Sequence, residues 1–262
     1  MKGRVLIVAG SDSGGGAGIQ ADIKTVTALG GYAATAIAAL TAQNTQGVFG
    51  IHPVPVEFVV QQMELVLDDI GADCLKFGML GSSEVIRAVA DVVERKCAAV
   101  PVVLDPVMVA KGGAPLLLAE AVDSMRRRLV PLATLLTPNI PEAETLVGHA
   151  EEDPEALARE LQALGPKSVL LKGGHREGDE IVDLLLDENG RLERFTSPRI
   201  DTPHTHGTGC TLASAIATGV AQGMTTRDAV ARARDYVLEA IRTAPGYGHG
   251  HGPLNHGHTL VS

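Results

Sequence analysis

The stretch VLIVAGSDSGGGAG, residues 5–18, joins a short apolar run to a glycine-rich loop, and a helical pattern follows near residues 17–29. This change from apolar run to helical pattern recurs along the chain. We predict strands at 4–9, 33–40, 73–77, 101–104, 133–137, 168–172 and 181–186. The predicted helices lie near 17–29, 56–68, 83–96, 118–128, 141–147, 154–164, 210–222 and 226–243.

The alternation of strands and helices predicts a three-layer αβα fold. In such a fold a mainly parallel central sheet is covered by helices on both faces. No serine- or glycine-rich linker divides the chain, and no internal repeat is found. We therefore predict a single domain over residues 1–262, a length that is ample for a sizeable core.

Composition excludes several classes of protein. A formal charge of −9 without a cluster of Lys and Arg disfavours nucleic-acid binding, and the absence of Trp removes one common stacking platform for bases. The three cysteines, Cys74, Cys97 and Cys210, contain no CxxC pair and indicate a reducing compartment. The apolar run at 5–9 is too short for a signal peptide, and no run approaches membrane-spanning length. We expect a cytoplasmic protein with no nucleic-acid or membrane partner.

Polar and glycine-rich segments follow four of the predicted strands. In open parallel sheets, ligands bind beyond the carboxyl ends of the strands. The distribution therefore predicts one ligand site at this edge of the sheet, formed by Gly10-Ser11-Asp12, Asp105-Pro106, Thr137-Pro138-Asn139 and Lys172-Gly173-Gly174-His175.

The first glycine-rich loop does not match the standard phosphate-binding motifs. No Gly-Lys-Ser/Thr follows it, and, counting from Gly14, Ile19 replaces the last glycine of G-x-G-x-x-G. Two interpretations stay open. The loop is either a plain turn from strand to helix, or a place where the missing side chains let a substrate approach the backbone closely.

A second glycine-rich turn, HTHGTGCT at residues 204–211, opens an apolar helix. The free N–H groups and the positive end of the helix dipole suit an anion, or the charge that develops on a transferring phosphoryl group. Cys210 stands at the helix N-terminus, where the pKa of a thiol is typically depressed from about 8.5 towards neutrality. A thiolate there can take a proton from a substrate hydroxyl. The alternative is a small buried cysteine that caps a tight turn.

The Gly-Thr-Gly-Cys sequence at 207–210 resembles the anion-hole signature of ribokinase-like kinases, and its cysteine is typical of hydroxymethylpyrimidine kinases and a related group of pyridoxal kinases. Further segments are similar to the hydroxymethylpyrimidine kinase family and occur in the family order, so the resemblance extends from residue 5 to about 257. They are residues 9–25, 42–45, 76–80, 105–108, 137–144 and 172–175. The resemblance implies a ribokinase-like fold.

The resemblance also implies a reaction and its cofactors. ATP and Mg²⁺ would serve to phosphorylate 4-amino-5-hydroxymethyl-2-methylpyrimidine, and then its monophosphate, for thiamine biosynthesis. Cys210 is then the general base, and the backbone N–H groups of Gly207, Thr208, Gly209 and Cys210 stabilise the transferring phosphoryl group.

On the nucleotide side, the resemblance makes Lys172 the contact to the ATP phosphates and makes Asn139 and Glu142 the organisers of Mg²⁺ and its water shell. Asp105 either caps a turn or helps to hold the metal. The alternatives are a solvated lysine at 172 and, at Glu142, a first-turn carboxylate favoured by the helix dipole.

For the acceptor, the resemblance places Gln43 against the pyrimidine ring, because its amide offers both the donor and the acceptor that an aminopyrimidine edge requires. Gly10, Asp22, Met79 and Val107 are expected around it. Met79 can alternatively be a core residue, and Asp22 a surface carboxylate in the first turns of a helix.

Other interpretations remain beside this one. The histidines of the tail, His249, His251, His256 and His258, favour a structural or nucleotide-flanking role over metal binding. A pyridoxal or pyridoxine kinase would use the same machinery on another hydroxymethyl heterocycle. A non-catalytic pyrimidine-binding protein would keep the fold without turnover. The family resemblance also implies a homodimer.

Overall fold

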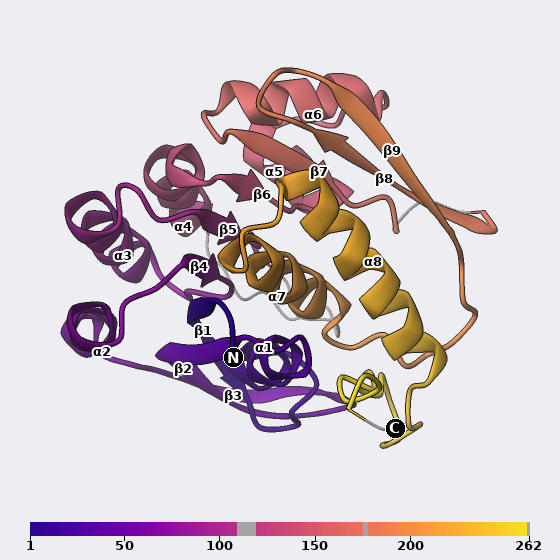
Figure 1. Cartoon of the computed structure of the whole chain (residues 1–262), viewed down its shortest axis with the longest axis horizontal. Coiled ribbons are helices and arrows are strands. Elements are labelled where there is room, and N and C mark those ends of the chain that lie inside the picture. The colour runs from indigo at the N-terminus through magenta and orange to yellow at the C-terminus, as the bar shows by residue number, and fades with distance from the viewer. Residues whose placement is uncertain (109–118, 175–177, 261–262) are drawn as a thin grey trace.

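The computed structural model describes residues 1–108, 119–174 and 178–260, which form three layers with a twisted sheet between two sets of helices (Figure 1). The strand order of the nine-stranded sheet is β3-β2-β1-β4-β5-β6-β7-β8-β9. The three-layer α/β fold with a mainly parallel sheet, predicted from the alternation of elements, is confirmed.

Six neighbouring strands run parallel and form the centre of the sheet. They are β1 (Arg4–Asp12), β2 (Tyr32–Asn44), β4 (Cys74–Phe77), β5 (Val102–Leu104), β6 (Leu135–Leu136) and β7 (Ser168–Leu171). Antiparallel strands extend both edges: β3 (Gly47–Pro53) pairs with β2, and β8 (Glu180–Leu186) and β9 (Leu192–Pro198) follow β7.

The strands β3 and β9 were not predicted, because both are edge strands with mostly exposed or half-exposed side chains. Burial against a helix layer produces the apolar runs that identify the central strands, and these two strands lack it. Their partners, β2 and β8, supply the hydrogen bonds that hold them.

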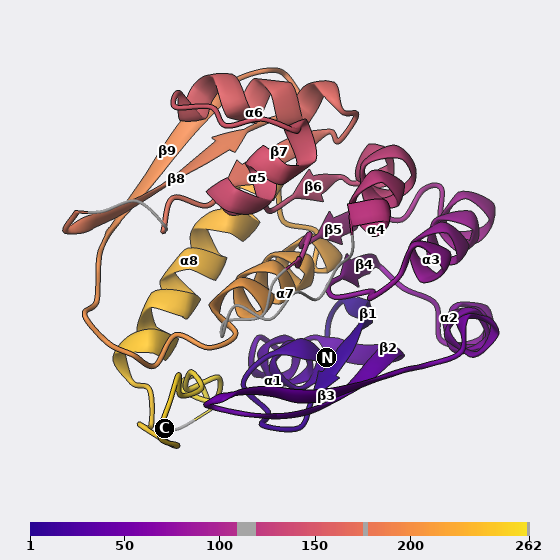
Figure 2. The ribbon, with the colours of Figure 1, turned by 180° about the vertical axis from the view of Figure 1, so that it is seen from behind.

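The helices cover the two faces of the sheet in two sets, as the two views show (Figures 1 and 2). One set is α1 (Gly18–Ala28), α7 (Thr208–Ala221) and α8 (Thr226–Arg242). The other is α2 (Val56–Asp69), α3 (Ser83–Lys96), α4 (Ala119–Ser124), α5 (Ile140–Val147) and α6 (Pro154–Ala163). A π-helical turn at Met125–Leu129 and a 3-10 turn at Val130–Leu132 follow α4.

Alternation along β1 divides the core between these layers. Leu6 and Val8 pack with α2 to α6 in one cluster, whereas Val5 and Ile7 pack with α1, α7 and α8 in the other. Because successive side chains of a strand point to opposite faces, one buried strand serves both cores. Residue 118, where the fourth predicted helix begins, lies outside the described residues.

One sheet contains every strand of the described residues, and the single domain over residues 1–262 stays a prediction. In that part of the chain, none of the helices has the length and hydrophobicity needed to cross a bilayer.

Leu75 and Leu65 offer a matched test of the core. Leu75 is fully buried in β4, whereas Leu65 on α2 is 65% exposed. Leu75→Ala should lower the free energy of unfolding by about 2–5 kcal/mol, since it removes buried methyl groups and leaves a cavity. Leu65→Ala should change it by no more than about 0.5 kcal/mol. Urea denaturation measures both, and equal losses would contradict the described core.

Candidate active site

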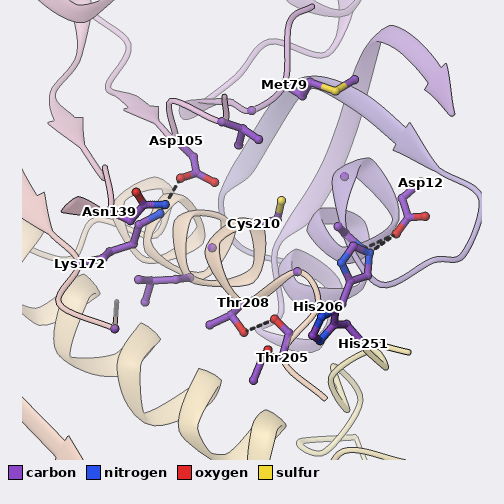
Figure 3. Close-up of a pocket in the computed structure, with 18 of the residues that line it drawn as sticks. Asp12, Met79, Asp105, Asn139, Lys172, Thr205, His206, Thr208, Cys210 and His251 are labelled. Carbon is purple, nitrogen blue, oxygen red and sulfur yellow. Dashed lines mark hydrogen bonds and ion pairs between the residues drawn. The ribbon is translucent and has the colours of Figure 1, made fainter. Parts of the chain in front are cut away.

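A cavity of about 1000 Å³ lies beyond the carboxyl ends of the parallel strands, where α7 begins. It collects all but one of the residues to which the sequence analysis gave a role in catalysis or in binding the nucleotide, the metal or the acceptor, from loops that are far apart in the chain (Figure 3). These are Gly10, Gln43, Met79, Asp105, Val107, Asn139, Glu142, Lys172, Gly207, Thr208, Gly209 and Cys210. The exception is Asp22, and His175 of the Lys-Gly-Gly-His segment lies outside the described residues.

A charged cluster stands at one side of the cavity. Lys172 Nζ lies 2.9 Å from Asp105 Oδ1 and 3.8 Å from Glu142 Oε2. The Lys172 side chain is only 14% exposed, so it is not a solvated surface lysine. Asp105 also accepts a 3.3 Å hydrogen bond from Thr137 Oγ1, and its side chain therefore joins the cluster and does not cap a turn. Burial raises the pKa of Glu142 to about 7. The charge of Asp105 adds to this rise, and the charge of Lys172 opposes it.

Asn139 and Glu142 form a capping box at the start of α5. The backbone N–H of Asn139 donates to Glu142 Oε2 at 2.8 Å, and the N–H of Glu142 donates to Asn139 Oδ1 at 2.9 Å. Local sequence causes this arrangement, because an asparagine followed three residues later by a glutamate satisfies two free N–H groups of a helix start. The cap holds both side chains in the cavity wall, so the capping role and a role beside a metal are compatible.

The cluster has the composition that Mg²⁺ requires. Two carboxylates, Asp105 and Glu142, share a single lysine, and the raised pKa of Glu142 reflects the burial that a bound cation would offset. Hard oxygen donors suit Mg²⁺, which retains several waters and needs only one or two carboxylates. The residues present therefore fit the ion.

The Gly-Thr-Gly-Cys turn lies directly against the first glycine-rich loop. Gly207 has a φ of 82° and precedes α7, and a Cβ at this position would overlap the carbonyl oxygen of Gly16. A Cβ at Gly209 would lie 3.3 Å from Lys172 Nζ, which shows how closely the helix start approaches the charged cluster. Thr208 Oγ1 donates to the carbonyl of Thr205 at 2.8 Å and fixes the turn. The amides at the start of a helix lack intrahelical partners, and residues 207–210 line the cavity; the amide of Thr208 donates to the carbonyl of Thr205 at 3.4 Å.

Cys210 is partly exposed and lies between the charged cluster and His206 in the view of Figure 3. The prediction of a lowered pKa for its thiol is wrong. Burial raises the pKa of Cys210 to about 11; Lys76 opposes this rise, whereas Asp22 and Asp105 add to it. The helix N-terminus was visible in the sequence, but the burial and the two carboxylates, which outweigh it, depend on the tertiary structure.

Asp22 is not among the residues that line the cavity. The residue is fully buried, so it is not a surface carboxylate, and its oxygens lie 2.8 and 3.0 Å from Lys76 Nζ. Ser214 Oγ of α7 donates to it at 2.7 Å. Lys76 does line the cavity, although its residue is fully buried by the surrounding chain. Sequence reasoning missed this lysine, and the available signal was a charged residue inside the apolar strand at 74–77.

Four of the five residues predicted for the acceptor line the cavity, namely Gly10, Gln43, Met79 and Val107. Met79 is partly exposed and lines the cavity, so it is not a core residue. A Cβ at Gly10 would overlap Met79 Cε, which shows that the end of the Met79 side chain lies directly against the backbone of the first loop. Gln43 lies near a buried pair, His206 and Asp12, that the sequence did not reveal. His206 Nε2 is 2.9 Å from Asp12 Oδ2 and 3.2 Å from Gln43 Nε2.

The histidines of the tail do not gather around a point. His256 bonds Thr211 Oγ1 at 3.0 Å, His258 bonds the carbonyl of Tyr236, and His251 lines the cavity. Among the described residues, no group of three or more His, Cys, Asp and Glu side chains is arranged to hold a metal ion.

Comparison with known proteins agrees with this geometry. The model of the phosphomethylpyrimidine kinase family matches residues 12–255. The chain belongs to this family. The resemblance found in the sequence is thereby confirmed.

The chain is similar in sequence to two curated relatives and in structure to one solved kinase. A hydroxymethylpyrimidine/phosphomethylpyrimidine kinase of Haemophilus influenzae is 48% identical, with 97% of this chain and 96% of the relative covered. The thiamine biosynthesis bifunctional protein ThiED of Geobacter sulfurreducens is 55% identical over 97% of this chain, which spans only 52% of that relative. The pyridoxal kinase of Staphylococcus aureus, in complex with AMP-PCP and pyridoxal, superposes with a TM-score of 0.89 at 32% identity, covering 98% of this chain and 94% of that one. The ribokinase-like fold implied by the sequence is confirmed by this likeness.

Proposed function

We propose that this chain transfers a phosphoryl group from ATP to 4-amino-5-hydroxymethyl-2-methylpyrimidine and then to its monophosphate, for thiamine biosynthesis. The observation that carries the proposal is the position of Cys210. It stands at the start of α7, in one cavity with the Lys172 cluster and with Gln43. The name of the Haemophilus influenzae relative supports the same substrates, and that of the Geobacter sulfurreducens relative supports thiamine biosynthesis.

The side of the cavity near Lys172 receives the nucleotide phosphates. Lys172 donates to phosphate oxygens, and the amides of residues 207–210 hold the negative charge of the transferring group. Asp105 and Glu142 would hold Mg²⁺, with Asn139 keeping Glu142 in place. When bound, the ion supplies charge neutralisation to the phosphates. Support for ATP comes from the AMP-PCP complex of the pyridoxal kinase.

Cys210 has different tasks in the two reactions. The first acceptor is a hydroxyl that must lose a proton, and Cys210 Sγ is the base that takes it. A pKa near 11 keeps the free thiol protonated at neutral pH, so the thiol must first release its own proton to solvent. Lys76 and the helix N-terminus stabilise the resulting thiolate, which then takes the proton of the substrate hydroxyl. The second acceptor is a phosphate, whose second pKa is about 6, and its oxygens are already ionised. The second reaction therefore needs no base.

The alternative within the same fold is a pyridoxal or pyridoxine kinase, since the similar solved structure holds pyridoxal. The higher identity to hydroxymethylpyrimidine/phosphomethylpyrimidine kinases favours the pyrimidine. A non-catalytic pyrimidine-binding protein is disfavoured by the intact base, charged cluster and anion-binding turn. The homodimer and the cytoplasmic location stay predictions.

The two tasks of Cys210 can be separated by one variant. Cys210→Ala should lower kcat for hydroxymethylpyrimidine by roughly 10²–10⁴-fold, the usual worth of a general base. The loss for the monophosphate should be much smaller, because that acceptor is already ionised. Steady-state assays with each substrate measure both, and Cys97→Ala, outside the cavity, is the control. A near-wild-type kcat on hydroxymethylpyrimidine would reduce Cys210 to a helix cap.

The metal role of Glu142 can be tested without losing the cap, because glutamine also completes a capping box. Glu142→Gln should raise the Mg²⁺ concentration needed for half-maximal activity while leaving pyrimidine binding unchanged. Glu144→Ala is the matched control, since Glu144 is on the same helix but does not line the cavity. A Mg²⁺ titration that is identical in wild type and Glu142→Gln would place Glu142 outside the metal site.

Parallel assays with hydroxymethylpyrimidine, its monophosphate and pyridoxal test the substrate itself. An unpaired buried polar group costs about 1–3 kcal/mol, so kcat/KM should favour hydroxymethylpyrimidine over pyridoxal by at least about tenfold. Gln43→Ala should collapse this gap. Comparable kcat/KM values for pyridoxal and the pyrimidine would favour the pyridoxal kinase instead, and refusal of the monophosphate would leave a kinase of the first step only.

A further inference from the structure

The Gln43 amide lies between two polar neighbours, one on each side. Its Nε2 position is 3.2 Å from His206 Nε2, and its Oε1 position is 3.1 Å from Thr41 Oγ1. A rotation of 180° about the last side-chain bond exchanges the amide oxygen and nitrogen without moving other atoms. Which end faces which neighbour is therefore decided by the hydrogen that each neighbour carries.

Asp12 determines the hydrogen on His206. Its carboxylate accepts backbone N–H bonds from Gly14, Gly16 and Ala17, and His206 Nε2 lies 2.9 Å from Asp12 Oδ2. Burial alone would raise the pKa of Asp12, but the bonds from His206 and the backbone bring it below its ordinary value, so the group is ionised at neutral pH. An ionised carboxylate only accepts hydrogen bonds, and His206 Nε2 must therefore carry the hydrogen.

Packing leaves His206 little freedom to turn away. The residue is 9% exposed, and a Cβ at Gly16 would overlap the Cδ2 edge of its ring. The backbone of His206 is bonded to the carbonyl of Gly252 in the tail. The ring thus packs against the first glycine-rich loop, and the backbone that carries it is bonded to the tail.

Thr41 points to the same orientation of the amide independently. Its hydroxyl lies 2.9 Å from the carbonyl oxygen of Ser11, which can only accept a hydrogen bond. The single hydroxyl hydrogen is used there, so Thr41 Oγ1 can only accept from Gln43. On the other side, the one hydrogen of His206 Nε2 is shared between Asp12 and the amide, and an Nε2 that carries a hydrogen has no lone pair to accept one from the NH₂ group. Both neighbours therefore favour the amide oxygen on the His206 side and the NH₂ group on the Thr41 side.

We propose that His206, anchored by Asp12, is a positioning residue that fixes the order of donor and acceptor on Gln43 and thereby selects an aminopyrimidine substrate. The oxygen of Gln43 keeps one lone pair, and its NH₂ group keeps one hydrogen, after the bonds to His206 and Thr41 are made. These two groups match an exocyclic amine beside a ring nitrogen. The phenolic oxygen of pyridoxal, once ionised, has no hydrogen for the amide oxygen.

The inference rests on the proposed function for its substrate and is tested by the ratio of kcat/KM for hydroxymethylpyrimidine to that for pyridoxal. His206→Phe removes the N–H and keeps a ring, and it should lower the ratio by about tenfold through KM and kcat for the pyrimidine, with KM for ATP unchanged. His206→Gln, which restores an N–H, should recover most of the ratio. In the double variant with Gln43→Ala, His206→Phe should cause no further loss, because the two residues act as one unit.

His204→Phe is the matched control, since His204 is two residues earlier in the same loop and does not line the cavity. It should leave the ratio unchanged. An unchanged ratio in a folded His206→Phe variant, while Gln43→Ala still collapses the ratio, would overturn the inference and leave the proposed function standing.

The ¹⁵N NMR spectrum of the histidine side chains in the unmodified chain tests the orientation directly, without any substrate. His206 Nε2 should carry a hydrogen, and this signal should be assigned by its loss in His206→Phe or, if that variant does not fold, in His206→Gln. An Nε2 without a hydrogen would overturn the inference even if the pyrimidine is the substrate. A protonated Nε2 in a chain that does not phosphorylate the pyrimidine would refute the proposed function and, with it, the selection of that substrate by His206.

Discussion

The close approach of two backbones, at Gly16 and Gly207, is the constraint on which the site depends. A side chain at Gly207 would overlap the Gly16 carbonyl, and Gly207 also needs a positive φ to begin α7. Only glycine meets both conditions. Because the two loops touch, the start of α7 is brought over the end of β1, and Cys210 and His206 reach the same cavity as Gln43. Asp12 strengthens this contact, since it binds both loops.

Charge is arranged around Cys210 in two separate groups. Lys76 is neutralised by Asp22, whereas Lys172 shares two carboxylates in the cavity wall. The first pair is fully buried, so breaking it would leave an uncompensated charge in the interior. The second group carries excess negative charge and is suited to a cation and the phosphates that accompany it. The Cys210 thiol between the two groups is protonated in the free chain. It must lose this proton before it can serve as the base of the first phosphorylation.

Much of the site was predictable because its signals are local. The strand at 4–9 is an apolar run, and the Asn139–Glu142 cap is a sequence pattern that closes its own hydrogen bonds within four residues. The loops that follow β1, β5, β6 and β7 meet at one edge of the sheet, as predicted, because parallel strands end on the same side. The role of each residue was supplied by the family resemblance and stays a proposal.

The sequence by itself determined the alternation of elements, the helix starts and the residue types that meet phosphate, because each of these is set by neighbours along the chain. Only the tertiary structure decided the partners that are distant in sequence. Lys76 meets Asp22 across 54 residues, and His206 meets Asp12 across 194. Burial and charge at Cys210 also come from distant elements, and they reverse the pKa direction that the helix N-terminus alone suggests. The edge strands β3 and β9 form for a similar reason, since their hydrogen bonds to neighbouring strands, more than any apolar pattern of their own, hold them in the sheet.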